Sequence, residues 1–344
     1  MVTGLIDAVT RLYRCCLLKH FYPVLQPAIG VGNAFEGWSP RAEGVVYSVI
    51  VPLTAPPGHT FHLELDTTGK MPGKNFCIRV ARACTCTGEQ RGKKMLCFFH
   101  SPEGELKRNE DPSRLWNLCT GSYLDVEKTA LLFKLLLEES WSCLPYYLHW
   151  RLRMVLSSFR SCKFRLYNDA ESFRVEVLFG VQQGDSDIYV ISQPTKALFT
   201  PSTTWQETYA VAEMKFFRHI ARQAPQDSCH LKCLQLLTCA LPARTFSTYT
   251  LKTVMMHLLN TIPMSQWCRR DFLHRLLDSL DYLRRSLQRK RLDCFVIGNP
   301  SIPVEINLPP DFPTVEPPNL FWHLTQDPYA HRKAMKEYFC LQNQ

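Results

Sequence analysis

The stretch IGVGNAFEGWSPRAEGVVYSVIVPL, residues 29–53, decides the fold class of this chain. Its second half, VVYSVIVPL at 45–53, is short, rich in β-branched residues and broken by proline only near its end, which predicts a buried strand. Two further segments, 60–66 and 76–84, alternate apolar and polar residues and predict neighbouring strands, with glycine- and proline-rich turns between them. The N-terminal half is therefore expected to contain a sheet of short strands.

The remainder of the chain separates into a mixed part and a helical part. Residues 125–141 begin with acidic side chains and keep a wide apolar face, which predicts a helix, and further strands are predicted at 161–167, 172–182 and 187–192. Beyond about residue 200 the composition becomes helical, with helices predicted at 205–222, 229–240, 249–260 and 270–291 and a short final helix. The sequence thus predicts an α+β protein with two lobes, residues 1–200 and 204–344.

Composition restricts the class of protein. The chain has 344 residues and 15 cysteines, an odd number scattered through apolar segments, which is typical of reduced core cysteines rather than of a secreted disulfide scaffold. No run of about eighteen apolar residues occurs, so we expect the chain itself to be soluble and intracellular. Residues 1–25 predict an amphipathic helix, in which Cys15 and Cys16 are either ordinary helix-face residues or palmitate acceptors beside a membrane.

The first quoted stretch also has the arrangement of a nucleotidyltransferase site without its metal ligands. In such a site a Gly-Ser turn opens a helix that holds a triphosphate, the next strand presents two carboxylates, and a later strand presents a third, so that two divalent ions are bound. Here Gly32 is present, but Asn33 stands in place of the serine. Ala42 and Gly44 stand where the two carboxylates belong, and only Glu176 matches the third position. Because one carboxylate cannot hold two magnesium ions, we predict a vestigial pocket with no catalytic residue, no metal and no cofactor.

Four side chains leave alternatives open. Glu36 and Glu43 are nearby carboxylates that could substitute as metal ligands, although Glu43 points away from the face of its neighbours if that stretch is extended. Lys252, in the segment TLKTV, could contact a phosphorylated ligand or could equally be a surface helix residue. His257 falls on an apolar helix face and is interpreted as a satisfied core histidine.

Ordered matches along nearly the whole chain indicate a family. They are GNAFEGW (32–38), VPLTAPPGHTFHLEL (51–65), LCTGSYLDVEKT (118–129), SCKFRLY (161–167), VEVLFGVQQGDSDIYVISQP (175–194), CHLKCLQLL (229–237), FSTYTLKTVMMHLL (246–259), LDCFVIGN (292–299) and EPPNLFWHL (316–324). On these segments the chain resembles the inositol trisphosphate receptor-interacting protein-like branch of the Mab-21-like family and, more distantly, cyclic GMP-AMP synthase.

The resemblance implies a fold, a role and a partner. It implies a nucleotidyltransferase-like mixed sheet with helices, followed by a helical lobe of helix-hairpin-helix type. It also implies a non-catalytic pseudoenzyme that binds or regulates a protein partner, such as the inositol trisphosphate receptor, in association with a membrane. The alternatives are a sensor that binds a nucleotide or an inositol phosphate, and a residual nucleotidyltransferase that uses Glu176.

The chain also departs from its relatives. Cyclic GMP-AMP synthase grips DNA with a zinc loop of His and Cys residues, whereas the stretch between His219 and Cys233 lacks the cysteine cluster, so no zinc-dependent DNA binding is expected. Members of this branch usually carry a membrane anchor ahead of the lobe, so this chain is interpreted as a soluble paralogue or a truncated one. The sequence does not determine an oligomeric state.

A helix rich in arginine and leucine suggests nucleic-acid binding as a third possible function. The net charge of +9 permits contact with nucleic acid, acidic partners or an anionic membrane, and the helix at 270–291 carries much of this charge. Its interspersed aspartates, Asp271, Asp278 and Asp281, weaken the hypothesis that it binds nucleic acid. Its leucines, at 273, 276, 277, 280, 283 and 287, are predicted to form one core-facing stripe.

Overall fold

The computed structural model describes residues 1–17, 21–39, 44–66, 74–84, 97, 99, 113–155, 158–193, 200–241 and 246–342. The chain divides into two compact units, which we call the sheet unit, Met1–Gly32 with Val46–Val211, and the helical unit, Asn33–Val45 with Ala212–Gln344. The predicted class, α+β with a mixed sheet followed by a helical region, is confirmed. Because the short segment Asn33–Val45 belongs to the helical unit, a single cut in the chain does not describe this division.

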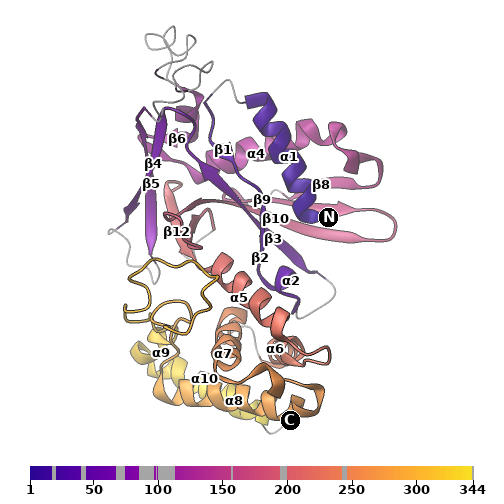
Figure 1. The fold of residues 1–344 in the computed structure, drawn as a ribbon, viewed down its shortest axis with the longest axis vertical. Coiled ribbons are helices and arrows are strands. Elements are labelled where there is room, and N and C mark those ends of the chain that lie inside the picture. Colours follow the sequence, from indigo (N-terminus) through magenta and orange to yellow (C-terminus); the bar gives the residue numbers. More distant parts are fainter. Residues whose placement is uncertain are drawn as a thin grey trace. The chain divides into compact units, whose positions relative to one another are not determined.

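The sheet unit is a mixed sheet accompanied by helices (Figure 1). Its principal strand order is β1-β3-β10-β11-β12-β5-β7-β6, and β2, β4, β8 and β9 pair alongside this path. The strands are β1 (Val24–Leu25), β2 (Ile29–Val31), β3 (Val46–Thr54), β4 (His59–Leu65), β5 (Asn75–Arg82), β6 (Cys119–Thr120), β7 (Tyr123–Leu124), β8 (Arg151–Val155), β9 (Cys162–Tyr167), β10 (Ser172–Gln182), β11 (Tyr189–Ile191) and β12 (Thr204–Thr208). The helices are α1 (Val2–Leu17) and α4 (Val126–Ser140), with 3-10 helices at Arg114–Leu118, Trp141–Cys143 and Pro145–Leu148.

Strand β10 is the centre of this sheet. It runs parallel to β3, antiparallel to β9 along its first half, and antiparallel to β11 at its C-terminal end. Val175, Val177 and Phe179 are buried, as expected for alternate residues that face a core. A side chain is excluded at Gly180, because a Cβ atom there would lie 2.8 Å from the Cγ2 of Ile191. Because β10 pairs with β3 on one side and β9 on the other around Glu176, the register of these pairs determines which residues lie beside Glu176.

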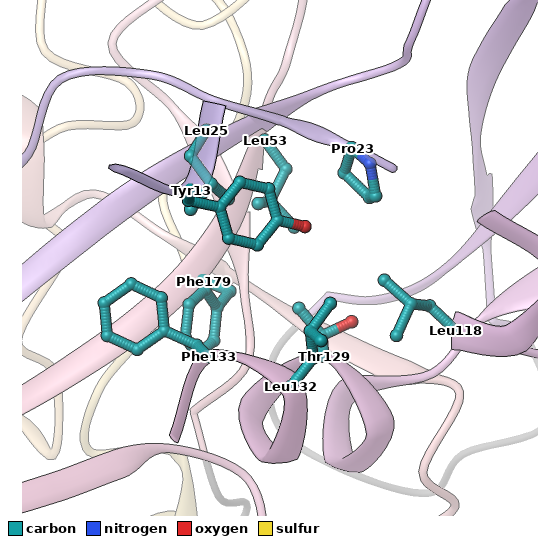
Figure 2. A pocket seen from close by; sticks show the side chains of 9 residues that line it. All are labelled: Tyr13, Pro23, Leu25, Leu53, Leu118, Thr129, Leu132, Phe133 and Phe179. Carbon is teal, nitrogen blue, oxygen red and sulfur yellow. The ribbon is translucent and has the colours of Figure 1, made fainter. Parts of the chain in front are cut away.

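Helices α1 and α4 pack together against the sheet. α1 contacts α4 and β1, and α4 contacts β9 and β10, so the two helices share one core with the strands. Leu5 and Ile6 of α1 are fully buried, so the predicted N-terminal amphipathic helix is confirmed over Val2–Leu17. It is wrong at the end of the predicted range, where Val24–Leu25 form β1. Tyr13, Phe133 and Phe179 line a cavity of about 10 Å³ at this junction (Figure 2). A cavity of that size holds at most about one water molecule, so it is a packing gap rather than a ligand site.

The predicted helix at 205–222 is wrong at its N-terminal end. Thr204–Thr208 form β12, which pairs antiparallel with β11 on one side and β5 on the other, and α5 begins only at Ala210. Trp205 is fully buried and donates its indole N–H to the backbone carbonyl of Leu124 at 3.0 Å. Ladder hydrogen bonds on both sides and this burial outweigh the weak helical pattern of the segment.

Asp125 caps helix α4 and accepts four hydrogen bonds. One of its oxygens accepts two amides of the first helical turn, and the other accepts the hydroxyls of Thr120 and Ser202, both at 2.6 Å. Burial raises the pKa of this carboxyl, but the four hydrogen bonds outweigh burial and lower it. We expect Asp125→Ala to lower the free energy of unfolding by about 3 kcal/mol, since a helix cap is lost and two polar hydroxyls lose their acceptor.

Urea denaturation at pH 7 measures this loss. Because the pKa of Asp125 is lower in the folded state, its contribution is present above the ordinary value of 3.8 and is lost as pH falls through the folded pKa. The difference between wild type and Asp125→Ala should therefore shrink in acid. Asp169→Ala, at an exposed turn, is the matched control and should change stability by less than about 0.5 kcal/mol. A loss at Asp125 no larger than this control would contradict the capping role.

The helical unit consists of packed helices and irregular connections. Its helices are α2 (Asn33–Glu36), α5 (Ala210–Gln223, entered from the sheet unit), α6 (His230–Ala240), α7 (Thr248–Thr261), α8 (Phe272–Arg289), α9 (Trp322–Gln326) and α10 (Pro328–Gln342). Helix α8 packs against α6, α7 and α10. The predicted helices at 229–240, 249–260 and 270–291 are confirmed as α6, α7 and α8. Helix α10 contradicts the short final helix that was expected, because it has 15 residues.

Helix α8 buries only part of its predicted leucine stripe. Leu283 and Leu287 are buried, whereas the side chains of Leu273 and Leu277 are 68% and 62% exposed. The stripe prediction is therefore wrong for the first half of the helix. Periodicity identifies a face, but the length of that face that is covered depends on the helices packed against it. None of the helices within the described ranges is long and apolar enough to cross a bilayer.

Candidate functional site

Glu176 lies on β10 beside a lysine and two serines. In the ladders it is directly opposite Lys163 of β9 and Ser48 of β3. Its Oε1 accepts the hydroxyl of Ser161 at 2.9 Å and lies 3.1 Å from the Nζ of Lys163. Neither strand neighbour places a second carboxylate opposite Glu176. This carboxylate is therefore neutralised by a lysine of its own sheet.

Lys252 lies inside the helical unit and not on its surface. Its Nζ is 2.6 Å from Oε1 of Glu36 and 2.7 Å from Oε2 of Glu213, and the ring centroid of Phe217 is 5.5 Å away. The side chains of this ion cluster, Glu36, Glu213 and Lys252, are 0%, 5% and 6% exposed. The interpretation of Lys252 as a surface helix residue is therefore wrong. Its contact with a phosphate stays a prediction, and two carboxylates already accept hydrogen bonds from its ammonium group.

The ion cluster holds the segment that follows the glycine turn. Gly32 has a φ of 79°, and α2 begins directly after it at Asn33 and ends at Glu36. The second oxygen of Glu36 accepts the indole N–H of Trp38 at 2.7 Å. Both oxygens of Glu36 thus have partners within the helical unit. Glu36, one of the two carboxylates considered as substitute metal ligands, is committed to Lys252 and Trp38 instead.

Burial and charge act in opposite directions on this cluster. Burial lowers the pKa of Lys252, but Glu213 and Glu36 outweigh it and raise this pKa, so the lysine stays charged. Burial raises the pKa of Glu36, and the nearby charge of Glu213 adds to the rise, while Lys252 opposes it. Two buried carboxylates and one ammonium group therefore depend on each other for neutralisation.

The other predicted site residues are distributed over both units. Gly32 and Glu176 belong to the sheet unit, and Asn33 and Gly44 belong to the helical unit. Ala42 and Glu43 lie outside the described residues, so the structure adds nothing to the predictions made for them. Within the described ranges, no group of three or more His, Cys, Asp or Glu side chains is arranged to hold a metal ion.

Sequence reasoning missed the acidic partners of Lys252 and the lysine beside Glu176. A signal was present for the first of these: a lysine in TYTLKTVMMHLL interrupts a helix that is apolar on most sides, and a buried lysine needs a carboxylate. Glu213, in the equally apolar opening of α5, carries the same signal. Identifying Glu36 as the second partner requires the tertiary structure, because 216 positions separate it from Lys252.

Two further predictions concern histidine and arginine. Nε2 of His257 is 3.0 Å from the backbone carbonyl oxygen of Asp293, and its ring stacks on Tyr282, which confirms a satisfied core histidine. In α8, Asp281 forms ion pairs with both Arg284 and Arg285. These pairs neutralise part of the basic helix for which nucleic-acid binding was considered, and that hypothesis stays untested.

Comparisons with known proteins agree with the family that the sequence predicts. The family described as Mab-21 protein HhH/H2TH-like domain matches residues 229–301. The chain is 34% identical over 351 residues to inositol 1,4,5-trisphosphate receptor-interacting protein-like 1 of Rattus norvegicus, an alignment that covers 98% of this chain and 63% of the relative. It is 27% identical over 365 residues to inositol 1,4,5-trisphosphate receptor-interacting protein of Homo sapiens, covering 98% of this chain and 65% of the relative.

These alignments have two consequences. They cover nearly all of this chain, so both the sheet unit and the helical unit are shared with the relatives. The chain spans less than two thirds of the relatives' length, at 63% and 65%. Because it contains the helix-hairpin-helix-like domain and is similar to these relatives along 98% of its own length, the chain belongs to the inositol trisphosphate receptor-interacting protein-like branch of the Mab-21 family.

Proposed function

We propose that this protein is a pseudo-nucleotidyltransferase that binds or regulates a protein partner without catalysing a reaction. The observation that carries the proposal is the state of Glu176, which stands without a second carboxylate on either neighbouring strand and is paired with Lys163. Two magnesium ions need several hard oxygen ligands that converge on one place. The donor set around Glu176, one neutralised carboxylate with serine hydroxyls, does not fit them.

The burial and the hydrogen bonds of Lys252 and Glu36 support the same proposal. A cation that binds triphosphate must be accessible, whereas Lys252 is buried and donates to two carboxylates. Glu36 in turn has both oxygens occupied by Lys252 and Trp38. Neither Lys252 nor Glu36 is therefore available to replace the missing ligands of the predicted vestigial pocket. That pocket was predicted at Gly32, Asn33, Ala42, Gly44 and Glu176.

An enzymatic assay tests this proposal. Purified protein incubated with nucleoside triphosphates and magnesium or manganese is expected to release no pyrophosphate and to form no nucleotide product above a no-protein blank. Cyclic GMP-AMP synthase with DNA in the same assay is the positive control. A product that is formed by wild type and abolished by Glu176→Ala would overturn the proposal, because it would show that this single carboxylate suffices.

The partner that we propose is a membrane receptor of the inositol trisphosphate receptor type, and the protein would be membrane-associated through it. Support comes from the relatives: the name of the human protein states that it interacts with the inositol 1,4,5-trisphosphate receptor, and the name of the rat protein states that it is like such a protein. Immunoprecipitation of the tagged chain from detergent-solubilised membranes, followed by blotting for that receptor, tests this point. Absence of the receptor from the precipitate, when full-length human inositol 1,4,5-trisphosphate receptor-interacting protein recovers it, would refute this partner.

A sensor of nucleotides or inositol phosphates is the weaker alternative. It needs an available cation near the glycine turn, and Lys252 is committed to Glu36 and Glu213. A ligand present at a hundred times its dissociation constant stabilises a protein by about 2.7 kcal/mol. Thermal denaturation with each ligand at millimolar concentration distinguishes the two functions, since a non-binding protein shows no shift.

A further inference from the structure

One exposed face of the sheet unit carries arginines in register. Arg153 of β8 lies directly opposite Arg165 of β9, and Arg165 lies directly opposite Arg174 of β10. Directly opposed residues point to the same face of a sheet, and neighbouring strands are about 4.8 Å apart. Arg151 precedes Arg153 by two residues and so shares this face. All four side chains are exposed, and we call them the arginine row.

The arginine row is not neutralised by the sheet. Like charges placed directly opposite each other destabilise a sheet, so an anion bound to the row would offset this repulsion. Over the described ranges, none of the four arginines forms an ion pair with a carboxylate. Within the part of the chain that the structure describes, Arg165 donates a hydrogen bond to the hydroxyl of Ser172 and lies beside the ring of Tyr167, while Glu176 on the same face is paired with Lys163. This face of the sheet therefore keeps a net positive charge to which an external anion can bind.

Strand β8 is also an edge of the sheet. As far as the structure describes the chain, β8 pairs with β9 alone (Figure 1). An edge strand presents backbone N–H and C=O groups to which another extended chain can pair. Charged side chains on an edge often prevent such pairing, but Arg165 and Arg174 stand on interior strands, where no protection of an edge is required.

Exposed apolar side chains lie close to β8 in sequence. Tyr147 and Leu148 precede β8 and are 52% and 80% exposed, and Phe159 follows it at 76%. Arginine and aromatic residues are enriched at protein interfaces, whereas lysine is depleted there. The composition of this region, with arginines rather than lysines beside aromatic residues, is that of a surface which binds protein.

We propose that β8 and the arginine row bind an acidic, extended segment of a protein partner, which adds to the sheet as a strand beside β8. Aspartate or glutamate at alternate positions would face Arg151 and Arg153, because guanidinium groups bind carboxylates in a bidentate manner. Apolar residues on either side of the acidic positions would cover Tyr147, Leu148 and Phe159. This surface rests on the proposed function as a binding protein and gives that function a location and a chemistry.

Other anions fit the surface less well. A small polyphosphate binds best in a concave site that buries most of it, whereas the four arginines stand exposed on a sheet face. An anionic membrane or a nucleic acid could neutralise the charge but cannot pair with the backbone of β8. Only a polypeptide satisfies both the charge and the open edge.

Peptide selection tests the proposal. Random 12-residue peptides are displayed on phage, selected against the full chain, and the enriched peptides are measured by fluorescence anisotropy. We expect enrichment of acidic residues at alternate positions. The double variant Arg153→Glu and Arg165→Glu should weaken binding at least about tenfold, and proline at the positions between the acids should do the same, since it removes ladder donors. Arg332→Glu with Lys333→Glu, an exposed pair on α10, is the matched control and should leave binding unchanged.

The outcomes separate this surface from the proposed function. Unaltered thermal unfolding of both double variants shows that a loss of binding is not a loss of fold. Peptides without alternating acids, peptides that bind equally after charge reversal, or peptides that tolerate proline would each overturn the proposal. Tighter binding of phosphatidylserine vesicles, tripolyphosphate or duplex DNA through the same arginines would overturn it in favour of that anion. Each of these results leaves the non-catalytic proposal standing, and a nucleotidyltransferase product would contradict only the latter.

Discussion

Replacing Lys252 by methionine is expected to lower the free energy of unfolding of the helical unit by about 3–5 kcal/mol at pH 7. Methionine keeps most of the side-chain volume but removes the ammonium group that lies 2.6 Å from Glu36 and 2.7 Å from Glu213. The substitution leaves two carboxylates that are almost fully buried without a cation. The cost is that of burying unpaired charge, or of protonating these carboxylates, rather than the loss of one favourable contact.

The pH dependence of this loss has a definite sign. In the wild type the pKa of Glu36 is already raised above its ordinary value of 4.5, so this group makes folding less favourable as pH rises through that window. Without Lys252 the opposing positive charge is lost and the hydrogen bond from Trp38 remains, so the pKa of Glu36 should increase further. The deficit of Lys252→Met should therefore be larger at pH 8 than at pH 5, as measured by urea denaturation at the two values.

Two comparisons isolate the charge effect at Lys252. Lys232→Met removes an exposed lysine of the neighbouring helix α6 and is expected to change stability by less than about 0.5 kcal/mol. Replacing Glu36 and Glu213 by glutamine in the Lys252→Met background should recover part of the loss, because the buried charges are then absent. A loss below about 1 kcal/mol for Lys252→Met alone, or one that does not depend on pH, would show that the ion cluster is not what stabilises this unit.

Replacing Trp205 by alanine is expected to cost the sheet unit about 3–5 kcal/mol. Trp205 and Trp267 are the largest fully buried side chains among the described residues, and Trp205 stands on β12 between β11 and β5. The substitution leaves a cavity and deprives the carbonyl of Leu124 of its indole donor. Chemical denaturation followed by far-ultraviolet circular dichroism measures the loss without relying on tryptophan fluorescence.

Two further variants separate volume from hydrogen bonding at this position. Trp205→Phe keeps much of the apolar volume and should lose about 1–3 kcal/mol, mainly from the unpaired carbonyl. Trp322→Ala removes a tryptophan that is 62% exposed on α9 and should be nearly neutral. Equal effects of Trp205→Ala and Trp322→Ala would mean that β12 does not hold the sheet together at this residue.

Segments with strong local patterns are predicted well from the sequence. Strand β3 follows from its β-branched run, and helices α4, α6 and α7 follow from apolar periodicity, with ends that differ from the predictions by only a few residues. Strand β12 is the instructive failure, since its residues form a strand only because β11 and β5 offer ladder partners on both sides. The exposed leucines of α8 fail for a related reason, because periodicity does not tell how far a neighbouring helix extends.

The sequence by itself determined the family, through ordered matches along nearly the whole chain. It also determined the absence of acidic residues at positions 42 and 44, and with it the expectation of a pocket without its metal ligands. Only the tertiary structure decided what the remaining charged residues do. Lys252 meets a glutamate 39 positions away and another 216 positions away, and the arginine row exists only through the register of three strands. Local patterns report which side of a segment is apolar, whereas the partner of a buried charge depends on contacts between segments that the chain brings together only on folding.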